Sequence, residues 1–116
     1  MRSIDLYLHD IQDAAKPCVR FTHGMSYDAF ISDEVIQSAV VRQLEIIGEA
    51  SKQIPAHFRA SHLYVPWSDM RDMRNRLIHA YFGIDYDIVW ETVRDDLPAL
   101  LPILDRLLAE FDKADK

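Results

Sequence analysis

Hydrophobic residues recur every three or four positions along most of the chain, which is the spacing of a buried stripe on an α-helix. This spacing predicts a first helix over residues 4–19, closed by a turn at residues 23–26. A second helix is expected to begin at Ser32 or Asp33, whose side chains accept the free amide hydrogens of a helix start, and to end before Pro55. The predicted core positions of these helices are Ile4, Leu8, Ile11, Ala15, Val19, Ile36, Val40, Leu44, Ile47, Ala50 and Ile54.

Glycines and prolines divide the middle of the chain. Gly48 lies inside the second predicted helix, where it costs roughly 1 kcal/mol relative to alanine, and we expect it to let another helix approach closely. Residues 55–66 are predicted to form a loop with one short turn. A third helix is predicted over residues 66–81, with Gly83 just after its end.

The last third of the chain predicts a helical stretch with a break in it. Asp85 opens a fourth helix, and the hydrophobic stripe continues to Phe111. Pro98 lacks an amide hydrogen and clashes with the carbonyl four residues earlier in an unbroken helix. We therefore expect a break or kink at residues 95–97, with Pro98 in the first turn of a fifth segment. The pattern as a whole predicts an all-α fold, an up-and-down bundle of four long helices with a kinked or separate fifth C-terminal helix.

Composition sets further limits. A chain of 116 residues, 49% hydrophobic and 28% charged, is expected to form one domain over residues 1–116. No hydrophobic run reaches the roughly 18–20 residues of a membrane span, and the N-terminus lacks the pattern of a signal peptide. The single cysteine, Cys18, excludes an internal disulfide and a cysteine zinc cluster. These features favour a reduced, cytoplasmic protein with no membrane association.

The net charge of −6 at first disfavours a nucleic-acid partner, because such binding depends on Lys and Arg that neutralise phosphates. The charge is unevenly distributed, however. Residues 57–81 include four arginines and two aspartates, a net charge of +2, while the rest of the chain carries −8. Such a zone suffices for a few phosphates and not for a long duplex. A solvated helix face with charges of both signs is the alternative interpretation.

Residues 71–81 carry the most informative chemistry. On a single helix Arg71, Asn75 and His79 line one face, opposite an apolar face. Arg74 lies at the border of the two faces, about 140° around the axis from His79. A site that uses both residues therefore requires either a reoriented Arg74 side chain or a second copy of the chain. The apolar face consists of Met70, Met73, Leu77 and Ala80.

Arginine and histidine together suit the cleavage of RNA. His79 can take and give a proton near neutral pH, Arg74 offers a charged fork for phosphate and its transition state, and Asn75 can hydrogen-bond either one. With the 2′-hydroxyl of RNA as nucleophile no metal-bound water is required, and DNA is not cut by this route. The spacing alone also fits a structural role, with the arginine paired to an acid and the histidine partly buried.

The segment from Arg74 to Trp90 resembles the signature of the HepT-like ribonucleases, which belong to the HEPN superfamily. The family motif, Arg-x4-His-x-Tyr with a polar residue after the arginine, maps onto Arg74, Asn75, His79 and Tyr81 without a departure. Other segments resemble the family in the same order, so that the resemblance covers nearly the whole chain. These segments are residues 7–11, 24–27, 44–50 and 95–98.

The resemblance implies a helical bundle that works as a homodimer. Facing motif helices from two protomers form a cleft in which RNA is cut without a metal or a cofactor. Arg74 and His79 are the implied catalytic residues, and Asn75, Arg71 and Arg76 are assigned supporting, phosphate-positioning roles.

The resemblance also implies a toxin, one half of a HEPN/MNT toxin–antitoxin module. The antitoxin is a minimal nucleotidyltransferase that transfers AMP to the motif tyrosine, here Tyr81, and the added anion would fill the cleft and repel RNA. The alternative is a non-enzymatic binding module that docks a nucleotidyltransferase and presents nucleotide or substrate to it. The acidic net charge favours this alternative, and the complete set of Arg74, His79 and Tyr81 disfavours it.

The predicted helices themselves suggest a homodimer. One motif helix alone exposes a flat row of side chains with no concavity to enclose a phosphate. Ala39, Val41 and Ile46 fall off the core stripe of the second helix, and we expect that one bundle cannot bury them all. Two copies about a twofold axis generate a groove with paired Arg74 and His79 groups.

The other reactive side chains have mostly structural interpretations. We expect Cys18 to be a small, semi-buried residue rather than a nucleophile. His9 is expected to hydrogen-bond a neighbouring helix rather than to form a catalytic pair with Asp10. His57 and His62 lack the pattern of a metal site, and a contact with RNA is the weaker functional alternative.

Two acidic residues, Glu45 and Glu49, lie one helical turn apart. They either face the motif helix and orient Arg74 or Arg76, or they form a solvent-exposed acidic stripe. The sequence leaves both interpretations open.

Overall fold

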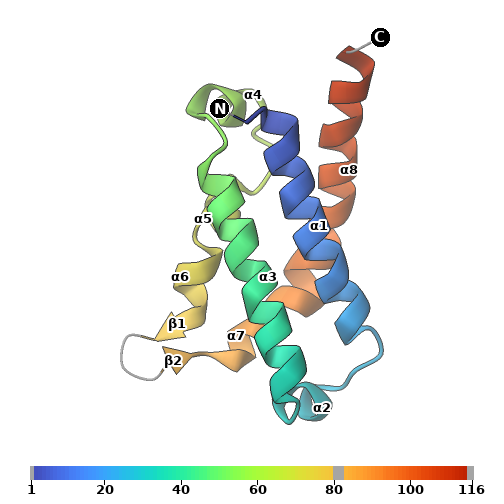
Figure 1. Ribbon diagram of the computed structural model, residues 1–116, viewed down its shortest axis with the longest axis vertical. Coiled ribbons are helices and arrows are strands. Elements are labelled where there is room, and N and C mark those ends of the chain that lie inside the picture. Colours follow the sequence, from blue (N-terminus) through green and yellow to red (C-terminus); the bar gives the residue numbers. More distant parts are fainter. Residues whose placement is uncertain (1, 80–82, 115–116) are drawn as a thin grey trace.

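Three long helices form the body of the protein: α1 (Ile4–Thr22), α3 (Glu34–Lys52) and α8 (Leu97–Ala114). The computed structural model describes residues 2–79 and 83–114. It places the long helices side by side, with α1 packed against both α3 and α8 (Figure 1). The predicted all-α bundle is confirmed.

Short elements connect the long helices. Between α1 and α3 lies a helix that the sequence pattern did not predict, α2. The elements are α2 (Tyr27–Ile31), α4 (Ala56–Ser61), α5 (Trp67–Arg71), α6 (Met73–Leu77), β1 (Ile78–His79), β2 (Gly83–Ile84), α7 (Tyr86–Glu91) and the π-helical segment η1 (Thr92–Asp96). β1 and β2 pair in antiparallel fashion, with His79 opposite Gly83.

The core lies where α1, α3 and α8 meet, and it is built from the predicted hydrophobic stripes. Burying each leucine or isoleucine side chain stabilises the fold by about 1.5–3 kcal/mol. The fully buried side chains include Leu8, Ile11, Leu44, Ile47, Leu104 and Leu107. Within residues 2–79 and 83–114, no helix combines the length and the hydrophobicity needed to cross a membrane.

The predicted limits of the second helix are confirmed. The Asp33 side chain accepts the amide hydrogen of Ile36 at 3.0 Å and so caps α3. At the other end, α3 stops at Lys52, three residues before Pro55. The predicted loop that follows is partly helical, because α4 occupies Ala56–Ser61.

The predicted third helix, over residues 66–81, is wrong in its continuity. Asp72 separates α5 from α6, and α6 ends at Leu77. The Leu77 carbonyl, which a longer helix would offer to residue 81, instead accepts the amide hydrogen of Asp85 at 2.7 Å. Gly83, with φ of +79°, therefore belongs to the returning strand β2 and does not follow a helix end. The bundle has three long helices rather than four, because pairing with a distant segment replaces the local helical hydrogen bonds.

A π-helical turn joins α7 to α8 at the place where a break or kink was predicted. The amide of Leu97 donates to the carbonyl of Thr92, five residues earlier. Pro98 follows in the first turn of α8, where a missing amide hydrogen costs least. The predicted irregularity is confirmed, and it takes the form of a wider turn within a helical run.

Candidate functional site

Arg74 borders a hollow of about 430 Å³ on one face of the bundle. Tyr7 and Asp10 of α1 line it on one side, Arg74 of α6 on the other, and Glu45 and Glu49 lie on α3 between them. We call this site the Arg74 hollow. Figure 1 shows α3 between α1 and α6, so the hollow extends over α3 from one neighbour to the other. The hollow lies beside Arg74, whereas Arg71 and Asn75 are not among the described residues that line it, so the expectation that their row is flat stays a prediction.

Gly48 brings the backbone around Arg74 close to α3. A Cβ atom at Gly48 would lie 3.7 Å from the carbonyl oxygen of Met70 and 3.8 Å from the backbone nitrogen of Arg74. The predicted close approach at this glycine is confirmed, although the partner is the junction of α5 and α6 rather than one long helix. This contact positions Arg74 at the edge of the hollow.

Charges of both signs line the Arg74 hollow. Arg2 donates a hydrogen bond to Asp10 at 2.5 Å, which raises the pKa of the arginine. Arg42 and Arg74 form no ion pair within the described part of the chain. The guanidinium groups of these two arginines are thus available to an anion in the same hollow.

Glu45 and Glu49 share this hollow with Arg74, but neither forms an ion pair with Arg74 among the described residues, so an orienting role for these acids stays a prediction. Glu45 is half-buried, whereas Glu49 is exposed and its carboxylate lies 3.4 Å from the ammonium group of Lys52. Arg76 does not face them.

Arg76 points away from the Arg74 hollow. Its guanidinium lies 3.6 Å from the carboxylate of Asp96 in η1, and both residues line a separate hollow of about 200 Å³ against α8. The structure therefore separates Arg74 and Arg76, although both belong to α6. Arg71 and Asn75, on α5 and α6, are exposed.

His79 and Tyr81 are placed only in part. The backbone of His79 lies in β1, directly after α6, so Arg74 and His79 do not share one helix and the 140° separation predicted for a helix does not apply. The side chain of His79 and the whole of Tyr81 lie outside the described residues.

The three residues that fall off the core stripe of α3 differ in their burial. Val41, expected to remain uncovered by a single bundle, is only 7% exposed in one chain. Ile46 is partly buried against the same core, and Ala39 is half-buried. A single chain therefore buries Val41 and leaves Ile46 and Ala39 partly exposed, and the homodimer stays a prediction.

The remaining candidates are mostly structural. Cys18 is fully buried rather than semi-buried as expected, and burial raises the pKa of its thiol to about 12, so the expectation that it is not a nucleophile is supported. His9 is exposed and makes no side-chain hydrogen bond to any described residue. The expected bond from His9 to a neighbouring helix is therefore wrong within the described residues.

His62 attaches α4 to α8. Its ring stacks on Phe58 with 4.1 Å between centroids, and its Nε2 lies 3.1 Å from the carboxylate of Glu110. His57 is exposed. Among the described residues, no three His, Cys, Asp or Glu side chains are placed to hold a metal ion together.

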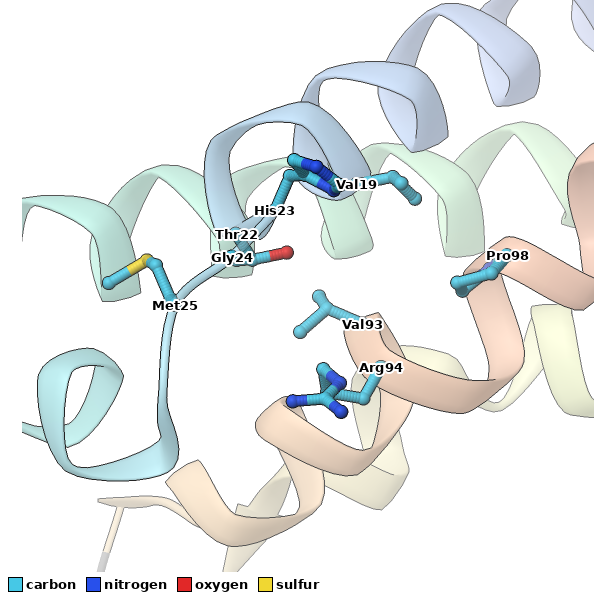
Figure 2. Close-up of a pocket in the computed structure, with 8 residues that line it drawn as sticks. All are labelled: Val19, Thr22, His23, Gly24, Met25, Val93, Arg94 and Pro98. Atoms are coloured by element: carbon cyan, nitrogen blue, oxygen red, sulfur yellow. The ribbon is translucent and has the colours of Figure 1, made fainter.

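A second hollow, of about 330 Å³, lies between the end of α1 and η1 (Figure 2). Figure 2 shows His23 and Arg94 on its rim, with Val93 and Pro98 on the side of the π-helical turn. The guanidinium of Arg94 also lies 5.1 Å from the centroid of the Trp90 ring. Sequence analysis missed this hollow, because nothing in the spacing of these residues signals that the π-helical turn faces the end of α1.

The fold and the site together define a small all-helical protein with an arginine-lined hollow beside an Arg-x4-His-x-Tyr segment. A model of the ribonuclease HepT-like family matches residues 11–107. The chain belongs to the HepT-like ribonuclease family, and the predicted family is confirmed.

Its relatives match over most of both chains. “Probable ribonuclease HepT” of Thermococcus cleftensis is 48% identical over 85% of this chain and 90% of that protein. Two proteins of Methanocaldococcus jannaschii are also similar. “Putative RNase MJ1380” is 44% identical over 85% of this chain and 91% of that protein. “Putative RNase MJ1216” is 37% identical over 99% of this chain and 95% of that protein. No solved structure matches the chain.

Proposed function

We propose that this protein is an endoribonuclease that cuts RNA without a metal ion, with Arg74 and His79 as its catalytic residues. One observation carries the proposal. Arg74, the first residue of an Arg-x4-His-x-Tyr segment in a chain of a ribonuclease family, borders a hollow and forms no ion pair with any described residue. An arginine without a carboxylate partner keeps its donors for phosphate.

The proposed reaction uses the RNA as its own nucleophile. A base takes the proton of the 2′-hydroxyl, the 2′-oxygen attacks the neighbouring phosphorus, and the bond from phosphorus to the 5′-oxygen breaks. An acid returns a proton to that oxygen, which leaves a 2′,3′-cyclic phosphate and a 5′-hydroxyl end. His79 supplies one of the two proton transfers, and Arg74 stabilises the extra negative charge on the phosphate oxygens. Asn75 and Arg71 lie on the same stretch and assist in positioning the phosphate.

Cleavage in the presence of EDTA tests this proposal directly. Purified protein is expected to cut single-stranded RNA in EDTA and to release 2′,3′-cyclic phosphate ends. His79→Ala should lower the rate by roughly 10²–10⁴-fold, the range for general acid–base residues, and circular dichroism should show an unchanged fold. His57→Ala is the matched control, because His57 is exposed on α4. Strict dependence on added Mg²⁺, or an unchanged rate in His79→Ala, would contradict the proposal.

We propose further that the enzyme is a toxin controlled by a partner nucleotidyltransferase that attaches AMP to Tyr81. The modification adds a bulky anion two residues from His79 in the sequence, where it would repel RNA phosphate. Mass spectrometry of protein expressed with and without a minimal nucleotidyltransferase of the antitoxin type tests this step. A mass increase of one or more AMP groups on the peptide that contains Tyr81 is expected, and Tyr81→Phe should remove it.

A non-enzymatic docking module is the second candidate function, favoured by the net charge of −6. Expression in cells separates the two candidates. The enzyme predicts growth arrest that the partner relieves and that His79→Ala abolishes. The docking module predicts no arrest at any expression level.

A further inference from the structure

The Arg74 hollow is lined by apolar, aromatic and acidic side chains that the binding of a phosphate does not require. Ile46 and Ala50 of α3 and Tyr7 of α1 line it, and the guanidinium of Arg2 lies over the Tyr7 ring, 4.9 Å from its centroid. Its volume of about 430 Å³ lies within the range of about 300–1,000 Å³ for small-molecule sites. The apolar side chains suit the flat face of a ring such as an unpaired nucleobase.

The carboxylates in this hollow are the informative feature. A carboxylate only accepts hydrogen bonds, and it repels the phosphate that Arg74 is proposed to bind. Acidic side chains beside such a site are therefore unfavourable for RNA, unless they accept hydrogen bonds from donor groups on a base. Their presence points to recognition of a base edge that is rich in donors.

Of the three acids in the hollow, Glu45 is the one available for this role. Asp10 already accepts a hydrogen bond from Arg2. Glu49 is exposed, and its carboxylate lies 3.4 Å from the ammonium group of Lys52. Glu45 is half-buried and has no hydrogen-bond or ion-pair partner among the described residues.

The bases differ in what they offer to a carboxylate. Guanine has two parallel donors on its Watson–Crick edge, the N1–H and the N2 amino group, which match the two oxygens of one carboxylate. Adenine and cytosine place an acceptor nitrogen beside their amino group, and uracil places its single N3–H between two carbonyl acceptors. Glu45 therefore favours guanine over the other three bases.

We propose that the Arg74 hollow is a nucleobase pocket that selects guanine next to the cleaved linkage. Glu45 accepts the two guanine donors, the apolar side chains of Ile46 and Ala50 lie against the ring, and Arg42 and Arg74 bind the adjoining phosphates. This inference rests on the proposed ribonuclease activity and names its substrate preference.

DNA strands with one ribonucleotide test this preference, because only the linkage after the 2′-hydroxyl can be cut. The ribonucleotide carries guanine, adenine, cytosine, uracil or hypoxanthine, and a second series varies the base on its 3′ side. In one of the two series the wild-type protein is expected to cut the guanine strand with a kcat/KM roughly 5- to 150-fold above the adenine strand, the range that one bidentate contact provides. Hypoxanthine, which lacks the N2 amino group, should fall between them.

Glu45→Gln should bring the guanine-to-adenine ratio of kcat/KM towards one, because an amide cannot accept both donors. The ratio is taken within each variant, so a partly unfolded preparation does not change it. Glu34→Gln is the matched control, since Glu34 is an exposed glutamate in the first turn of the same helix, and it should keep the wild-type ratio.

Equal rates for guanine and adenine in both series of the wild type, or an unchanged ratio in Glu45→Gln, would overturn the nucleobase pocket and leave the ribonuclease proposal intact. If these strands are not cut, the pocket is tested by binding alone, and the ribonuclease proposal fails only when single-stranded RNA is also left uncut. Fluorescent 2′-O-methyl oligonucleotides that contain guanine or hypoxanthine serve as probes. Equal affinities for them would then also overturn the pocket.

Discussion

Burial decides which reactive side chains of this protein are available for chemistry. Arg74 is exposed at the edge of a hollow, where its charged fork can meet a phosphate. Cys18, the single nucleophilic thiol of the chain, is fully buried, and its Sγ lies 3.9 Å from the carbonyl oxygen of Val40. A site built on arginine and histidine is therefore compatible with this fold, and a site built on the thiol is not.

Replacing Arg74 should be more harmful to activity than replacing another exposed arginine. Arg74→Ala is expected to lower kcat/KM for RNA by roughly 10²–10³-fold, the cost of removing one donor that stabilises transition-state charge. Arg74→Lys should restore only part of the loss, because an ammonium group lacks the planar fork. Arg20→Ala, at the far end of α1, is the control and should keep the wild-type rate. Equal rates for Arg74→Ala and Arg20→Ala would exclude Arg74 from the site.

Cys18 should make stability depend on alkaline pH. The thiol ionises near its ordinary pKa in the unfolded chain, whereas burial raises the folded pKa from 9.0 to about 12. Its contribution to stability is therefore complete below about pH 8.5 and is lost as the pH rises towards 12. Urea unfolding between pH 8 and pH 11 is expected to show a smaller decline in Cys18→Ala than in the wild type. Parallel declines in the two proteins would show that the thiol does not ionise preferentially on unfolding.

At the scale of elements, the segment from α5 to β2 shows how contacts with the rest of the fold shape the site. Gly48 allows the backbone at the junction of α5 and α6 to contact α3. The amide of Asp85 then takes the last helical carbonyl of α6, at Leu77. Together these contacts shorten the motif helix, place Arg74 beside α3 and put the backbone of His79 in a strand.

Substitutions at Gly48 should therefore distinguish the effect of helix propensity on stability from the effect of packing against the α5–α6 junction. A Cβ atom fits at 3.7–3.8 Å from the neighbouring backbone, so Gly48→Ala should be tolerated and stabilise α3 by up to about 1 kcal/mol. Gly48→Val adds two further carbons against the Met70 carbonyl and is expected to destabilise the protein by about 1–3 kcal/mol. Urea unfolding measures both changes. A stability of Gly48→Val equal to that of Gly48→Ala would show that the α5–α6 junction moves freely away from α3.

At the scale of the whole molecule, an acidic chain presents a few arginines that form no ion pair with a described residue. The net charge of −6 opposes non-specific binding of long nucleic acids, while Arg42 and Arg74 share one hollow. This distribution suits a short contact with RNA of a few phosphates.

The proposed homodimer can be tested by complementation. If Arg74 and His79 of one site come from different protomers, mixing the inactive Arg74→Ala and His79→Ala chains regenerates an intact site in each mixed dimer. About one quarter of the wild-type rate per chain is then expected after subunit exchange at equal amounts. Sedimentation of labelled chains confirms the exchange. A mixture that exchanges and stays inactive, or a monomer with the full rate, would contradict the composite site.

The sequence by itself determined the helical character of the chain, because the spacing of Leu8, Ile11, Leu44 and Ile47 depends only on local geometry. It also determined the cap at Asp33 and the irregularity before Pro98, since both follow from single residues and their backbone chemistry. The motif that identifies the family is likewise a local string of residues.

Tertiary structure decided where the helix of the motif segment ends and which residues lie beside it. The helix predicted to reach residue 81 ends at Leu77, where the amide of Asp85 donates to the Leu77 carbonyl. Arg74 and Arg76, two residues apart, face different hollows because α3 lies on one side of α6 and η1 on the other. Hydrogen bonds and packing between distant segments have no local signature, and only the folded chain shows which acids share a hollow with Arg74.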